Sequence, residues 1–316
     1  MDVGKRRAIF YSLMALALLA PIAAFALYSA IHAQGGGAAV VTTVVGRETS
    51  NFAESVELDF PRALSIAGKT SLTAGVNHVV SSGEAMDDAQ LRLRELAWNA
   101  TYYGVPSVLM SNNSISDWTA RLQTKGLAYG LNVSAVVTDV SIVPYDSFHV
   151  LFSANMSLKA RSEAYSLNLT RSLYAQALVS IEGVEDPLYP LNTNGLVGRV
   201  LRANTTAVYG VEALDSFFAD RRYVPSADGA SFMDRLEGRA VLSPRYSSSR
   251  ATGLESLVDL SQLLGQGIII KENSTVADYY YFNTTTPAGY GVNGSAYPLL
   301  LLDNASASVF GVGLAS

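Results

Sequence analysis

The residues Ala8 to Ala33 constrain this chain most, because they form a run of 26 residues without one charged side chain. As a helix rising about 1.5 Å per residue, the run would be roughly 39 Å long, enough to cross a hydrocarbon core of roughly 30 Å with some tilt. Pro21 in its middle would kink that helix. The alternative is a cleaved secretory signal, whose apolar region normally runs only about 7–15 residues. The sequence therefore predicts a single N-terminal transmembrane helix.

The charges that flank this run predict its orientation. Lys5, Arg6 and Arg7 precede it, and no Lys or Arg follows until Arg47. The positive-inside rule places such a basic segment in the cytoplasm and everything after the span outside. We therefore expect a protein of the cell membrane with residues 1–7 as cytoplasmic leader and 8–33 in the lipid bilayer. A flexible Gly linker at 34–37 and an extracytoplasmic domain over 38–316 would follow.

The basic residues and the apolar run permit another interpretation. Lys5-Arg6-Arg7-Ala8 followed at once by an apolar helix resembles the class III leader of archaeal pilins and archaellins. The resemblance implies that the leader is removed and that the segment from Ile9 packs against copies of itself in a filament. The Glu usual near the fifth mature position is missing, because Leu13 stands there. A pilin-like subunit is thus an alternative to a simple anchor.

Glycosylation acceptors of the type N-x-[ST] support an exterior location independently. With 15 Asn and 53 Ser or Thr in 316 residues, random placement gives roughly 2.5 acceptors. The chain has ten, none with Pro in the middle position: Asn99, Asn112, Asn132, Asn155, Asn168, Asn204, Asn273, Asn283, Asn293 and Asn304. We therefore expect an N-glycosylated surface.

Composition narrows the source and excludes several function classes. The absence of cysteine removes disulfides, thiolate catalysis and cysteine-ligated metals, and a eukaryotic ectodomain of this size would normally carry disulfides. Bacterial acceptors mostly have an acidic residue two positions before the Asn, and none of the ten does. An archaeal surface protein fits these observations. The net charge of −5 gives no reason to expect nucleic acid as a partner.

The pattern beyond the linker predicts an α+β fold in which helices flank an antiparallel meander. Helices are expected from Asp59-Phe60-Pro61 to residue 80, after Ser81-Ser82-Gly83-Glu84, and from Ser114, where Asp117 completes a capping box. Strict alternation then predicts strands over 133–143, 148–158 and 165–181.

The remaining sequence predicts shorter elements of both kinds, and residues 183–195 form the one candidate boundary between two lobes. The expected helices cover 211–218, 230–237 and 252–264. The expected strands cover 268–271, 276–282, 297–302 and 308–312.

Motifs that carry chemistry are scarce. The sequence has no nucleophile elbow, zinc-protease motif, phosphate-binding loop or EF-hand loop, so neither a cofactor nor a metal is expected. Glu185 and Asp186 form an acid pair in a loop fixed by Pro187, where they could bind a cation or transfer protons. Tyr279, Tyr280 and Tyr281 lie on an expected strand, where exposed rings could stack on sugars or on a partner protein.

Three segments carry a further resemblance. Residues 59–64 (DFPRAL), 182–189 (EGVEDPLY) and 232–238 (FMDRLEG) are similar to uncharacterised archaeal single-span surface proteins, which also begin with a basic leader and one apolar helix. The resemblance implies a location and no activity.

The sequence therefore favours a membrane-anchored, N-glycosylated structural or interaction protein of an archaeal cell envelope, and not an enzyme. Its partner would be an envelope or surface-layer protein. One alternative is a pilin-like subunit that binds itself in a filament. The other is an envelope enzyme that uses Glu185 and Asp186.

Overall fold

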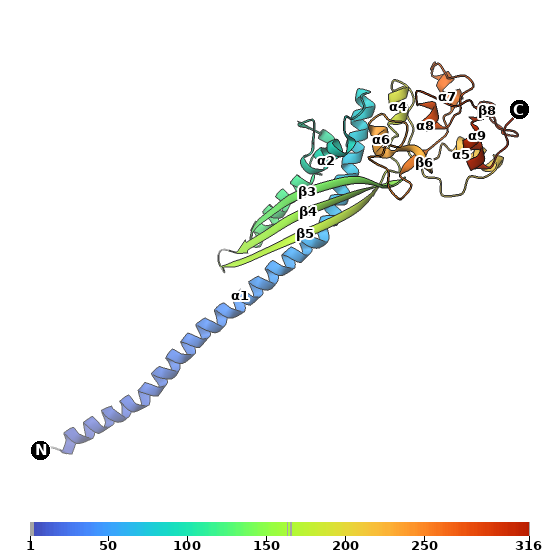
Figure 1. Cartoon of the computed structure of the whole chain (residues 1–316). Helices are drawn as coiled ribbons and strands as arrows, with labels where there is room; N and C mark the ends of the chain where they lie inside the picture. Colours follow the sequence, from blue (N-terminus) through green and yellow to red (C-terminus); the bar gives the residue numbers. More distant parts are fainter. Residues whose placement is uncertain (1–2, 163, 165, 316) are drawn as a thin grey trace.

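A single long helix dominates the computed structural model, which describes residues 3–162, 164 and 166–315, with side chains from residue 43 onward. This helix, α1 (Val3–Ser82), contains 80 residues and is about 120 Å long at 1.5 Å per residue. Figure 1 shows that its first half runs away from the rest of the molecule, whereas its second half lies along the other elements.

Two sequence predictions for this region are wrong. The expected linker at 34–37 is helical, and the expected helix start at Asp59–Pro61 lies inside α1. Extending an existing helix fixes only one residue for each hydrogen bond that forms. The neighbouring turns can therefore compensate for a Gly inside the helix, which costs about 1 kcal/mol relative to Ala, or a Pro, which costs about 3 kcal/mol. Phe60 and Leu64 are fully buried on either side of Pro61 and hold the helix through it.

The predicted membrane span covers residues 8–33, whose side chains the structure does not describe. Among the residues with described side chains, no helix combines the length and the apolar character needed to cross a membrane.

Residues 132–180 form the predicted antiparallel meander. The strands β3 (Asn132–Asp146), β4 (His149–Ser162) and β5 (Leu167–Ser180) lie in the order β3-β4-β5. Alternate residues of β4, from Val150 to Leu158, are buried as the sequence pattern predicts. Mixed α and β structure with antiparallel sheets and flanking helices is therefore confirmed.

The buried face of the meander packs against the second half of α1. Leu64 and Leu72 of the helix share one core with Phe152 of β4 and Val179 of β5. The two layers approach closely at Gly68, where an added Cβ would lie 3.0 Å from Phe152 and Val179 side-chain atoms. A residue without a side chain at this position permits that approach.

Two helices flank this core. The helix α2 (Ala89–Asn99) begins later than predicted, because its N-cap is Asp88, whose carboxylate accepts the Leu91 N–H at 2.9 Å. The helix α3 (Ile115–Ala128) begins with the predicted capping box of Ser114 and Asp117. Between them lie β1 (Thr101–Tyr102), β2 (Val105–Pro106) and the 3₁₀ turn η1 (Val108–Met110).

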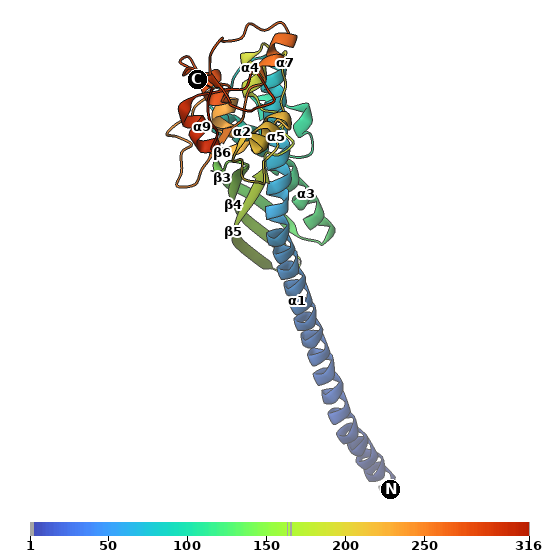
Figure 2. The same cartoon turned by 90° about the vertical axis from the view of Figure 1, so that its right-hand side faces the viewer.

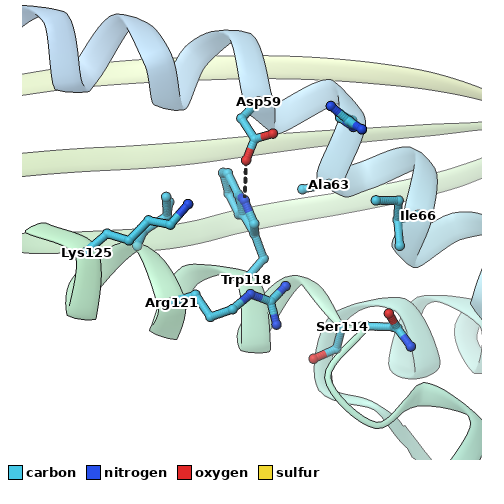
Figure 3. Close-up of a pocket in the computed structure, with 10 residues that line it drawn as sticks. Asp59, Ala63, Ile66, Ser114, Trp118, Arg121 and Lys125 are labelled. Carbon is cyan, nitrogen blue, oxygen red and sulfur yellow. Dashed lines mark hydrogen bonds between the residues drawn. The ribbon is translucent and has the colours of Figure 1, made fainter.

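A tryptophan fixes α3 to α1. The Trp118 indole N–H donates to the Asp59 carboxylate at 3.0 Å, and its ring stacks on Phe60 with centroids 5.3 Å apart. Figure 3 shows Trp118 between the two helices, at a pocket of about 200 Å³ where Arg121 and Lys125 also lie. The long helix therefore contacts the rest of the fold on more than its sheet-facing side.

The C-terminal half consists of short elements. They are α4 (Leu188–Asn192), α5 (Val211–Ala219), β6 (Val224–Ser231), α6 (Phe232–Leu236), β7 (Gly253–Glu255), α7 (Leu260–Gly265), α8 (Asp278–Tyr281), β8 (Tyr290–Gly291), β9 (Leu301–Leu302) and α9 (Asn304–Phe310). The strands β6 and β7 pair antiparallel, as do β8 and β9. Figures 1 and 2 show these elements gathered near the Ser82 end of α1.

Several predictions fail in this half. The expected strands at 276–282 and 308–312 are instead the helices α8 and α9, and the expected helix at 252–264 divides into β7 and α7. Asp303 and Asp259 act as N-caps for α9 and α7, and each accepts backbone N–H groups that begin a helix. The expected helix at 211–218 is confirmed as α5.

The buried apolar residues form two clusters. The first contains the α1–meander core together with Phe232, Met233 and Leu254. The second contains Tyr189, Leu214 and Phe310 with other residues from α5 onward. The chain passes from the first cluster to the second near residue 188 and later returns, so the expected boundary at 183–195 does not divide the clusters cleanly.

Candidate functional site

A fully buried arginine joins three segments of the C-terminal half. Arg235 of α6 donates from Nη1 to Asp186 at 2.6 Å and lies 2.9 Å from the Asp278 carboxylate, and none of the three side chains is exposed. Its Nη2 donates to the Leu254 carbonyl at 2.6 Å. Burial lowers the pKa of Arg235, but Asp186 and Asp278 outweigh this, and the pKa is raised overall. The guanidinium therefore remains charged.

Both carboxylates of this cluster are satisfied by further donors. Asp186 also accepts the Tyr223 hydroxyl at 2.8 Å and the Leu188 N–H at 3.0 Å. Asp278 accepts the Ser256 hydroxyl and the Tyr279 N–H, each at 2.7 Å. We name Asp186, Tyr223, Arg235, Ser256 and Asp278 the buried ionic cluster. Because its members are paired with one another and sealed from solvent, removing any one of them would leave a buried charge or polar group without its partner.

The acid pair predicted from the sequence is divided by this arrangement. Asp186 belongs to the buried ionic cluster, whereas the Glu185 side chain is half-buried and forms no hydrogen bond or ion pair with described residues. Burial, and next the Asp186 charge, raise the pKa of Glu185. With Asp186 engaged, the two carboxylates offer no shared site for a cation. Among the described residues, no group of three or more metal-ligating side chains is placed to hold a metal ion.

The run of tyrosines at 279–281 was predicted to lie on a strand with rings on both faces, but it forms a helical turn instead. In the helical turn α8, Tyr279 and Tyr281 are buried and Tyr280 is half-buried. The Tyr281 hydroxyl accepts the Lys271 N–H at 3.1 Å, so this ring is part of the internal packing. Tyr279 and Tyr280 instead line a cavity of about 540 Å³.

This cavity, which we name the tyrosine pocket, is the candidate functional site. Its walls are Tyr279 and Tyr280 of α8, residues 227–228 of β6 and the segment 241–247. The two rings lie with centroids 4.3 Å apart and planes tilted by 36°. Ligand sites usually have about 300–1,000 Å³, and the volume of this open pocket lies in that range.

Three polar side chains of the tyrosine pocket have no hydrogen-bond partner among the described residues. Ser243 is only 6% exposed, and its buried hydroxyl forms no hydrogen bond. Asp228 and Ser247 are exposed, and their side chains form no hydrogen bond or ion pair with described residues. A buried hydroxyl that lacks a partner is costly, so Ser243 is a group that a ligand or a water molecule could satisfy.

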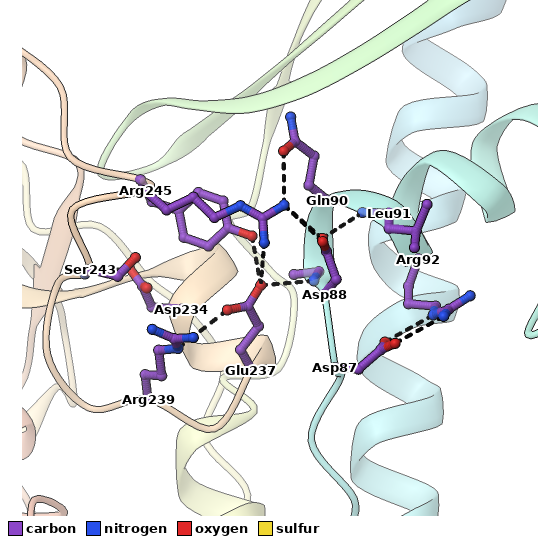
Figure 4. A network of polar contacts seen from close by, with 12 residues as sticks. Asp87, Asp88, Gln90, Leu91, Arg92, Asp234, Glu237, Arg239, Ser243 and Arg245 are labelled. Atoms are coloured by element: carbon purple, nitrogen blue, oxygen red, sulfur yellow. Dashed lines mark hydrogen bonds and ion pairs between the residues drawn. The ribbon is translucent and has the colours of Figure 1, made fainter.

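The wall that carries Ser243 is held firmly. Figure 4 shows Ser243 beside a network in which Arg245 reaches Asp88 at 2.9 Å, and Tyr246, on the same segment, donates to Glu237 at 2.6 Å. Glu237 also accepts the Ala89 N–H at 2.9 Å. The pocket wall is thus tied to α6 and to the start of α2, so its shape is fixed in advance of any ligand.

The ten glycosylation acceptors lie at or near the surface. Eight are exposed and two, Asn204 and Asn283, are half-buried. Asn155 and Asn168 lie on the open face of the meander, as the alternation predicts, and Arg161 pairs with both Asn132 and Asn168 in the strand register. All ten positions are accessible enough to remain candidate acceptors.

Sequence reasoning missed Arg235, Asp278 and Ser243. Arg235 follows Phe232 and Met233 in a short apolar segment that also contains an Asp. Charged residues in such a segment could have indicated that they are buried and paired. Glu255 was missed as well. It is 7% exposed, and its pKa is raised to about 8 by burial and next by the Asp278 charge.

Comparisons of this chain with protein-family models, with curated proteins and with solved structures found no match. The function is therefore argued from the geometry alone.

Proposed function

We propose that this chain is a pilin-like subunit of an archaeal surface filament, held in the membrane by residues 8–33 before assembly. The observation that supports this most is α1, one helix whose second half is built into the core and whose first half extends beyond it (Figure 1). An apolar helix that projects from a folded head must be buried elsewhere, either in lipid or among copies of itself.

The exterior location rests on two independent features. Lys5, Arg6 and Arg7 on one side of the apolar run favour a cytoplasmic N-terminus. The ten glycosylation acceptors are exposed or half-buried, so glycans could be attached to them without entering the core. Together these features support an extracytoplasmic head.

The continuity of α1 supports a fixed rather than a flexible connection to the head. Among residues 43–82 of α1, Thr49 is the first buried one, and residues 34–48 continue the helix between it and the expected span. At 1.5 Å per residue this spacer is roughly 23 Å long. A stiff spacer would hold every head at the same distance from the helix core of a filament, as regular assembly needs.

The second candidate function is a stand-alone envelope protein that remains anchored and binds an envelope or surface-layer partner. The absence of Glu at position 13, where Leu stands, favours it over a filament subunit. The tyrosine pocket favours it as well, because a recognition site serves a single anchored head equally well.

The mass of the N-terminus in the native protein separates the two candidates. A pilin-like subunit should begin at Ile9, and electron microscopy of sheared surface material should show filaments that contain this chain. A variant with Arg6 and Arg7 changed to Ala should keep its leader and form no filaments. An intact leader on wild-type protein found only in membranes would reject the filament and favour the anchored protein. Protease protection of the head in intact cells would reject both.

A further inference from the structure

The composition of the tyrosine pocket points to a class of ligand. Its lining contains no Lys or Arg, which argues against phosphate, sulfate or carboxylate groups on a ligand. It contains two aromatic rings, one carboxylate and two serine hydroxyls, a combination of a flat apolar surface with acceptors and adjustable donors.

We propose that the tyrosine pocket binds a neutral carbohydrate. A pyranose ring has one face of C–H groups that packs on an aromatic ring, and an edge of hydroxyls that donate to a carboxylate and exchange hydrogen bonds with serines. The half-buried Tyr280 presents the ring, the unpaired Asp228 the carboxylate, and Ser243 a hydroxyl that lacks a protein partner.

The geometry favours a carbohydrate over a cationic side chain, which could also use a tyrosine and an aspartate. A lone ammonium or guanidinium only donates hydrogen bonds, so it would leave the proton of the Ser243 hydroxyl without an acceptor. A sugar with several hydroxyls both donates to Asp228 and accepts from Ser243. The volume of about 540 Å³ also exceeds what one side chain fills.

This proposal is independent of filament formation, because every residue that it uses lies in the described head and none lies on α1. It also admits two sources of the sugar, a glycan on another copy of this chain or a sugar from elsewhere. The chemistry that the pocket recognises is the same for both.

The test measures binding of methyl glucoside, methyl mannoside, methyl galactoside and maltose to the full-length protein in detergent, by calorimetry and by saturation-transfer NMR. At least one sugar should bind. Tyr280→Ala should weaken this binding about tenfold or more, because it removes the stacking ring. Tyr280→Phe should restore it, and Asp228→Asn should weaken it. Tyr174→Ala, which removes an exposed ring on β5, is the matched control and should leave it unchanged.

Two further measurements separate the sources and the rival ligand. Wild-type protein enzymatically freed of its own glycans should bind the sugar at least as well, and competition by the released glycans would identify another copy as the source. A Gly-Lys-Gly amide is the cationic probe. The proposal is overturned if none of the sugars binds, if Tyr280→Ala binds like wild type, or if only the lysine peptide binds.

Discussion

The two halves of the described molecule bury their interiors by different means. Residues 43–181 are built mainly from the second half of α1, two flanking helices and three strands of 14–15 residues. The helices after residue 181 have only 4–9 residues. Every buried Asp, Glu or Arg among the described residues lies after residue 181, in the second half: Asp186, Arg199, Asp234, Arg235, Glu255, Asp278 and Asp303.

This difference shows what short elements require. A long strand or helix satisfies its backbone groups by repetition, and alternating apolar side chains complete the core. A chain of short turns leaves many carbonyl and N–H groups at their ends, so buried carboxylates and guanidinium groups bind them. Arg235, for example, holds the Leu254 carbonyl while it pairs with Asp186 and Asp278. In the second half, buried charged side chains thus bind backbone groups that regular strands and helices satisfy by their repeating hydrogen bonds.

The largest effect should come from removing that charge. Arg235→Ala leaves the Asp186 and Asp278 carboxylates buried without their partner, and breaking a buried pair in this way costs about 3–5 kcal/mol. Both tryptophans, Trp98 and Trp118, lie in the first half, so their fluorescence follows that half in a denaturant titration. Near-UV circular dichroism of the tyrosines reports on both halves. We expect both signals to be lost at lower denaturant than in wild type, because Phe232 and Met233 beside Arg235 belong to the core that contains α1 and the meander.

Arg94→Ala is the matched control for this variant, because Arg94 is exposed on α2 and has no partner among the described residues. It should shift neither transition. A free energy of unfolding within 1 kcal/mol of wild type for Arg235→Ala would mean that the ionic cluster does not hold the second half together.

Between pH 5 and 9, the burial of Glu255 in the second half should make the free energy of unfolding depend on pH. The pKa of Glu255 is about 8 in the folded protein and about 4.5 unfolded, so the folded state binds the proton more tightly. The stability that this gives is fully present below pH 4.5 and is lost as pH rises through 8, on the order of 3–5 kcal/mol. Glu255→Gln, which stays neutral, should remove this fall. Unfolding measured from pH 5 to 9 checks it, and an equal slope in both proteins would contradict it.

The same difference explains which parts of the fold could be predicted from the sequence alone. The meander could be predicted because its strands alternate over many residues, from Val133 to Ile181. The helices α8 and α9 could not, because four to seven residues contain too few periods to distinguish helix from strand. Asp186 and Tyr280 were identified as candidates, but their surroundings come from Arg235 and Ser243, which lie far from them in the chain. Such pairings are tertiary and leave no local pattern.

In the first half, the effect should be steric. Gly68→Val places side-chain atoms against Phe152 and Val179, where even a Cβ would lie at 3.0 Å, and overpacking of this kind costs about 1–3 kcal/mol. Gly46→Ala is the matched change on the same helix, because nothing lies within 4 Å of its Cβ. It should stabilise α1 by up to about 1 kcal/mol. Thermal unfolding of both variants followed by tryptophan fluorescence measures the pair. Equal shifts would show that the helix and sheet are not in close contact.

The smallest effects should come from the glycosylation acceptors on the open face of the meander. Asn155 and Asn168 are exposed, and a slip of either strand by one residue would exchange the two faces and bury them. Asn→Gln at either position should remove a glycan and change the free energy of unfolding by less than about 0.5 kcal/mol. Asn204 is the contrast, since it is half-buried and its amide donates to the Thr206 carbonyl, so Asn204→Gln should cost more. Glycopeptide mass spectrometry with melting curves of the three variants tests this order. Unmodified Asn155 and Asn168, with strong destabilisation on substitution, would mean that the open face of the meander is covered in the native protein.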